Sequence, residues 1–79
     1  MTVVEYAVIL FHSTQSAIQA ERVLLRAGLN VRLIPTPRQF SSNCGTALRL
    51  AVGDVVQAKV GLHAGGAEFD RVETETRQP

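Results

Sequence analysis

The pattern of apolar and polar residues along the first third of the chain predicts a strand followed by a helix. The run Val3–Phe11 is apolar at almost every position and rich in β-branched and aromatic side chains, which indicates a central strand. Ser13 or Thr14 can cap a helix after it, because a side-chain oxygen there accepts an otherwise unpaired backbone N–H. Apolar residues then recur at helical spacing: Ala17, Ala20, Val23, Leu24 and Ala27. Gly28 is a natural helix stop.

The rest of the chain predicts three more strands and one more helix. The expected elements are strands at Leu29–Ile34, Thr46–Val52 and Ala67–Val72, and a helix at Val55–Ala64. Pro35 and Pro37 end the second strand, because proline cannot donate to a β-ladder. Gly65 and Gly66 end the second helix. Residues 73–79 contain no apolar side chain, so we expect a disordered C-terminal tail.

This order of elements, β-α-β-β-α-β, favours an α+β fold. The economical packing for so short a chain is a ferredoxin-like two-layer sandwich, in which two helices cover one face of a four-stranded antiparallel sheet. We therefore expect a single domain over residues 1–72; a small three-layer α/β fold is the main alternative. In the ferredoxin-like topology the first and second strands end, and the last strand begins, at the same end of the sheet. His12–Ser13, the 35–45 loop and residues 63–66 should then lie close together.

The sheet face turned away from the helices is expected to be apolar. Both faces of the first strand carry apolar side chains, with Tyr6, Val8 and Leu10 on one face and Ala7, Ile9 and Phe11 on the other. An uncovered apolar sheet face usually marks an interface. We therefore predict a homodimer, or docking on a partner protein, through this open face.

Composition and charge narrow the classes of function. The net charge of +1 argues against a nucleic-acid-binding module, which usually carries a strong basic excess. No apolar stretch approaches the roughly 20 residues of a membrane helix, and the early apolar run lacks the features of a signal peptide. A single unpaired cysteine in such a chain fits a reducing cytoplasm.

The candidate site is that cysteine, Cys44, which lies in a polar, turn-rich segment. A cysteine must be a thiolate to act as a nucleophile or to hold transferable sulfur. Arg38 could supply positive charge, the hydroxyls of Ser41 and Ser42 could donate hydrogen bonds, and nearby backbone N–H groups could form an anion-holding nest. Gly45 leaves space beside the sulfur. The alternative is that Cys44 is simply a small buried residue at the start of the third strand.

The remaining polar candidates are supporting residues. His12 could assist proton transfer at the cysteine if the expected topology holds, and Ser13 stands beside it. His63 has the same potential with less support. One cysteine and two separated histidines do not form a zinc site, which needs four ligands at suitable spacing, and no phosphate-binding glycine pattern occurs. We expect no metal and no cofactor.

Several of these segments together resemble a known family. The segments are Tyr6–Thr14, Ala20–Leu24, Ala27-Gly28, Ile34-Pro35-Thr36-Pro37-Arg38 and Ser41-Ser42-Asn43-Cys44-Gly45. They are similar to the Putative selenium/sulfur carrier protein-like family over about residues 5–72. The resemblance implies that Cys44 holds a persulfide or a selenium adduct. The polar tail after Val72 is an addition of this chain.

Two main kinds of function remain open at this point, beside a redox-sensing thiol that would need a second subunit or a small thiol as its resolving partner. In the first, a cysteine desulfurase or a selenium-delivery enzyme loads Cys44, and the thiol passes the atom to an acceptor. In the second, the chain is a small anion-binding regulatory or interaction module, in which Arg38, Ser41 and Ser42 bind a metabolite and the cysteine is incidental. Both describe a carrier or accessory protein better than a stand-alone enzyme.

Overall fold

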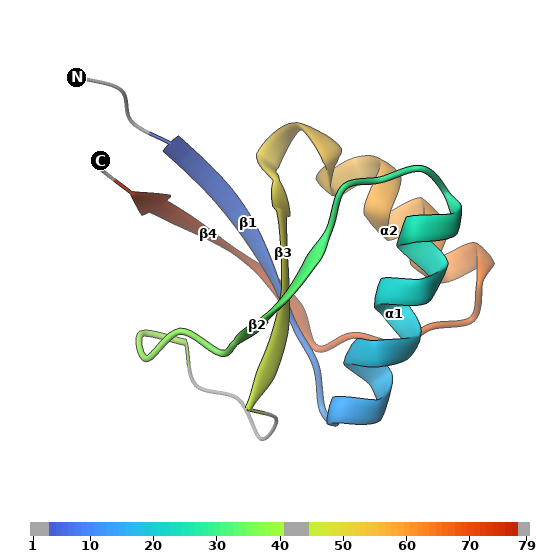
Figure 1. Ribbon diagram of the computed structural model, residues 1–79, viewed down its shortest axis with the longest axis horizontal. Helices are drawn as coiled ribbons and strands as arrows, with labels where there is room; N and C mark the ends of the chain where they lie inside the picture. The colour runs from blue at the N-terminus through green and yellow to red at the C-terminus, as the bar shows by residue number, and fades with distance from the viewer. Residues whose placement is uncertain (1–3, 41–44, 78–79) are drawn as a thin grey trace.

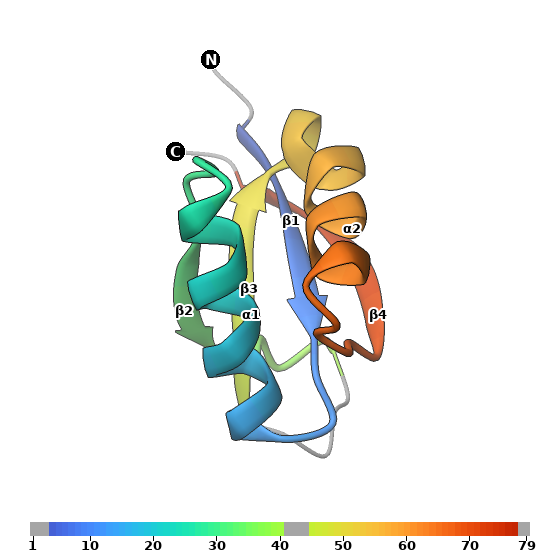
Figure 2. The same cartoon turned by 90° about the vertical axis from the view of Figure 1, so that its right-hand side faces the viewer.

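The chain forms a four-stranded antiparallel sheet with two helices on one face (Figures 1 and 2). The computed structural model describes residues 4–40 and 45–77. The elements are β1 (Val4–Leu10), α1 (Thr14–Arg26), β2 (Arg32–Pro35), β3 (Thr46–Ala51), a 3-10 turn η1 (Val52–Asp54), α2 (Val55–Ala64) and β4 (Arg71–Arg77). The strands lie in the order β2-β3-β1-β4. The predicted α+β ferredoxin-like sandwich is therefore confirmed.

The main core lies between the sheet and the helices. Alternate residues of the strands point to the helices, and the small and branched apolar residues of α1 and α2 meet them. The buried members of this core include Ala7, Ile9, Phe11, Ala17, Ala20, Leu24, Leu48, Leu50, Ala58 and Leu62. The helices approach closely at Gly61, where an added Cβ would lie 3.3 Å from Leu24 Cδ2. Gly61 therefore serves helix packing, although it lowers the helix propensity of α2.

Both helices end in the same hydrogen-bonded motif. After α1, Gly28 has a φ of +85° and the N–H of Leu29 donates to the carbonyl of Leu24 at 3.0 Å. After α2, Gly66 has a φ of +68° and the N–H of Ala67 donates to the carbonyl of Leu62 at 2.9 Å. These are Schellman motifs, in which a left-handed glycine turns the chain and pairs the last carbonyls. The predicted glycine stops are confirmed.

The last strand lies later in the sequence than expected. Residues 73–77, expected to form a disordered tail, belong to β4, which pairs with β1 from Arg71 opposite Leu10 to Arg77 opposite Val4. The expected strand at Ala67–Val72 is wrong except for its last two residues. The physical reason is that an edge strand needs little apolar content. Threonine favours extended backbone, and alternating charges protect an exposed edge from further pairing.

The open face of the sheet carries a second, smaller apolar cluster. Val8, Leu10 and Ala47 are fully buried there, and Ile34 and Phe40 pack against them. Figure 1 shows the segment after β2 on the side of the sheet away from the helices. This part of the face is covered within the chain itself, so the premise of an uncovered apolar face is wrong here. The homodimer stays a prediction, and analytical ultracentrifugation would test it.

The two ends of the described chain lie side by side. Val4, at the start of β1, pairs with Arg77, at the end of β4. Both ends leave the sheet at the end opposite the β2–β3 loop (Figure 1).

Candidate functional site

Four strands bring separate segments of the sequence to one end of the sheet. Leu10, at the end of β1, pairs with Ala47 of β3 and with Arg71 of β4. Pro35, at the end of β2, pairs with Thr46, at the start of β3. The segment after β1, the β2–β3 loop and the segment before β4 therefore meet at this end, as the topology predicted.

The β2–β3 loop is fixed at its base and along its first half. The N–H of Thr36 donates to the carbonyl of Gly45 at 3.0 Å, which closes the loop. The N–H of Phe40 donates to the carbonyl of Pro37 at 3.0 Å, which forms a tight turn. Arg38 lies in this turn with an exposed side chain. The turn directs Phe40 onto the apolar cluster of the open face, so the first half of the loop packs on the sheet.

The predicted central residue lies outside the described residues. Cys44 belongs to segment 41–44, together with Ser41 and Ser42, and the structure describes the chain on either side of it. Gly45, the residue bonded to Cys44, is exposed, and a Cβ built on it would meet no atom within 4 Å. The space beside the sulfur, which the sequence predicted at Gly45, stays a prediction because Cys44 lies outside the described residues.

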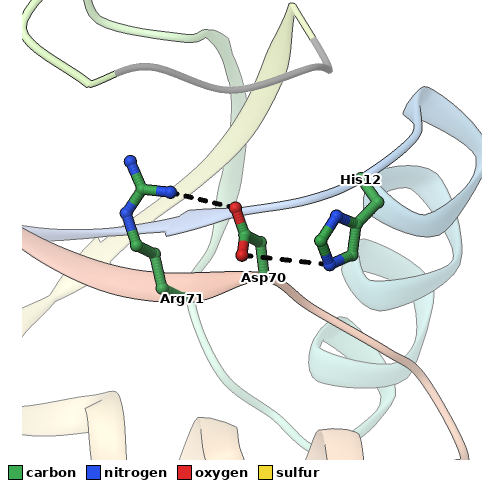
Figure 3. Close-up of polar contacts among 3 residues, drawn as sticks. All are labelled: His12, Asp70 and Arg71. Atoms are coloured by element: carbon green, nitrogen blue, oxygen red, sulfur yellow. Dashed lines mark hydrogen bonds and ion pairs between the residues drawn. The ribbon is translucent and has the colours of Figure 1, made fainter.

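His12 lies beside an acidic residue that precedes β4. His12 Nε2 is 3.8 Å from Asp70 Oδ1, and the histidine side chain is 64% exposed (Figure 3). Arg71 Nη1 donates to the other carboxylate oxygen of Asp70 at 3.0 Å. The N–H of Asp70 donates to the carbonyl of Leu10 at 2.7 Å, which holds this carboxylate at the end of β1. The structure thus assembles an imidazole, a carboxylate and a guanidinium at the loop end of the sheet.

Two of the other predicted residues are in different situations. The hydroxyl oxygen of Ser13 accepts from the N–H of Ser16 at 3.1 Å, so Ser13 is the cap of α1. His63 is exposed in the last turn of α2, and no interaction within the described part of the chain joins its side chain to the loop or to His12. Within residues 4–40 and 45–77 no group of three or more histidine, cysteine, aspartate or glutamate side chains could hold a metal ion.

Sequence reasoning missed Asp70 and Phe40 as parts of this site. Asp70 falls within the strand expected at Ala67–Val72 and has no predicted role there; its proximity to His12 follows only from the pairing of the last segment with β1. Phe40 stands in a polar segment with no periodic pattern around it. A signal was available for Phe40, because a lone large aromatic residue in a polar loop is a candidate for packing on an apolar face.

The fold and the loop define a small α+β domain whose only thiol belongs to the β2–β3 connection at one end of its sheet. A family model described as Putative Se/S carrier protein-like matches residues 5–72. The chain therefore belongs to this family. Comparison with curated proteins and with solved structures gave no match. In the described part of the chain, no helix has the length and apolar character needed to cross a membrane.

Proposed function

We propose that this chain carries sulfur or selenium on Cys44, as a persulfide or its selenium counterpart. The observation that carries the proposal is the family match over residues 5–72, a range that includes the only cysteine of the chain. A carrier needs a side chain that can form and release a bond to sulfur, and a thiolate does this where a methionine thioether does not. Cys44 is therefore the residue to which the family description directs the chemistry.

The loading step is a transfer between two thiols. The Cys44 thiolate attacks the outer sulfur of a donor persulfide, a new S–S bond forms at Cys44, the donor S–S bond breaks, and the donor leaves as a thiolate. Cys44 is oxidised to the persulfide level while the donor persulfide is reduced to a thiol, so no further oxidant is needed. A cysteine desulfurase supplies such a donor; a selenium-delivery enzyme supplies the selenium equivalent.

The described surroundings favour an anionic sulfur at this end of the sheet. The exposed Arg38 turn brings positive charge to the loop end, whereas the charge of Arg71 is paired with Asp70. His12 can accept the thiol proton, and Asp70 at 3.8 Å favours one orientation of its ring. No described atom lies within 4 Å of a Cβ built on Gly45, which supports access of a partner to the neighbouring cysteine.

Intact-mass measurement tests this proposal. The purified chain is prepared without reductant and exposed to a cysteine desulfurase with cysteine. We expect a reducible mass gain of one sulfur atom in the wild type and none in Cys44→Ser.

A matched control distinguishes a loading site from an exposed thiol. Gln57 is exposed on α2, so Gln57→Cys in the Cys44→Ser background offers a surface thiol elsewhere. Equal loading of this thiol, or no loading of an alkylatable Cys44, contradicts the carrier proposal. The second result would favour the anion-binding module, whose ligand should raise the melting temperature of wild type and Cys44→Ser alike.

A further inference from the structure

Two arginines lie side by side on the open face of the sheet. Arg32 of β2 is directly opposite Arg49 of β3 in the strand register. Arg49 in turn pairs with Val8, whose side chain lies in the open-face cluster, so Arg32 and Arg49 point to the same side. Like charges directly opposite one another on neighbouring strands are destabilising. A ligand of opposite charge would remove this cost.

The position of one arginine is set by an aromatic ring. The guanidinium carbon of Arg49 lies 4.6 Å from the centre of the Tyr6 ring, a cation–π distance. Neither Arg32 nor Arg49 forms an ion pair with a carboxylate in the part of the chain that the structure describes. A fixed guanidinium without an acidic partner is well suited to bind an anion, because fewer rotamers are lost on binding.

A pocket adjoins this pair. Its volume is about 320 Å³, at the lower end of the range for small-molecule sites. Its lining includes Tyr6, Arg32 and Arg49, together with Asn30 and Asp54. Two guanidinium groups and one carboxylate give the lining a net positive charge. The carboxylate favours ligands that can also donate a hydrogen bond.

We propose that this pocket binds an oxyanion that still carries a proton, of the hydrogen phosphate class. Arg32 and Arg49 donate to its charged oxygens, a geometry for which the guanidinium fork is suited. Asp54 accepts from its P–OH group. Sulfate has the same shape and no proton near neutral pH, so it leaves the Asp54 carboxylate facing a second negative charge. The described lining of the pocket includes no residue of the Cys44 loop, and the inference does not depend on the carrier function.

The test is a titration of the isotope-labelled full chain with inorganic phosphate, in which NMR records the amide chemical shifts. Sodium chloride keeps the ionic strength constant. We expect saturable shifts near Arg32, Arg49 and Asp54. Arg32→Gln should raise the Kd about tenfold, as expected for losing a charged hydrogen bond. Arg32 is exposed, so this variant should stay folded. Arg26→Gln, on the surface of α1, is the matched control and should leave the Kd unchanged.

Titration with sulfate tests the role of Asp54 in binding. It should bind about tenfold more weakly than phosphate, and Asp54→Asn should remove most of that difference. Equal affinity for both anions in the wild type contradicts the protonated-ligand assignment. Shifts that do not saturate, that appear equally with chloride, or that saturate with the same Kd in Arg32→Gln overturn the site altogether.

Discussion

Phe40 should couple the stability of the domain to the reactivity of Cys44. Its ring is partly buried on Val8, Leu10 and Ala47, and it stands four residues before the cysteine. Removing a buried phenylalanine ring costs about 3–5 kcal/mol, and a partly buried one should cost about 2 kcal/mol. For a domain of this size that loss lowers the melting temperature by roughly 8–16 °C.

Phe69→Ala is the matched control for Phe40→Ala. Phe69 is also partly buried, but it packs against the main core on the helix side of the sheet. We expect both variants to lose a similar free energy of unfolding in urea denaturation. Of these two variants, Phe40→Ala should release the loop from the open face, because Phe40 packs on that face and Phe69 does not.

The decisive readout is the rate at which a small disulfide reagent modifies Cys44. A loss of about 2 kcal/mol raises the unfolded population by about 30-fold, so the rate must be corrected for the unfolded fraction of each variant. After that correction, we expect Phe40→Ala to change the rate severalfold and Phe69→Ala to leave it unchanged. Equal rates in all three proteins would refute the reasoning, because the packing of Phe40 would then have no effect on the thiol.

Three further changes test individual features of the fold and the loop. We expect Gly66→Ala to lower the free energy of unfolding, measured by urea denaturation, by about 1–2 kcal/mol, because φ at this position is +68°. Gly53→Ala should lower it far less, because Gly53 has an ordinary φ and open space around it. Ser13→Ala should cost about 1 kcal/mol by the same measurement, through the lost bond to the N–H of Ser16; no loss would contradict its role as the cap. Gly45→Ala should leave the urea midpoint of unfolding unchanged, because the added Cβ meets no described atom within 4 Å. The same variant should slow sulfur loading by a desulfurase in the mass assay. An unaltered loading rate would show that the space at Gly45 is not used.

The sequence predicted the elements whose burial follows a regular period. β1 is apolar on both faces because it is a central strand with a core on each side, and α1 has both a clear apolar stripe and a polar cap. In β1 and α1 the pattern of apolar residues and the conformational propensities of the residues predict the same element, so the local sequence was sufficient. The sequence also predicted that the β2–β3 loop, His12 and the start of β4 meet at one end of the sheet, because the order of strands and helices alone determines this.

The features that the sequence did not reveal depend on contacts between distant segments. β4 buries little apolar surface, so the polar run after Val72 carried no hydrophobic signal even though its backbone completes the sheet. The covered open face depends on Phe40, whose partners lie in β1 and β3. The Arg32–Arg49 pair depends on strand register, which two short strands joined by the ten-residue loop 36–45 do not specify locally.

The pairing of Val4 with Arg77 has a practical consequence for handling this protein. Both ends of the described chain leave the sheet together, at the end away from the β2–β3 loop (Figure 1). An affinity tag, a fused reporter domain or a surface linker attached at either terminus would therefore extend away from the loop. Tethered chains would present the cysteine segment outward to a soluble donor enzyme, so loading could be followed on an immobilised layer without cutting the attachment.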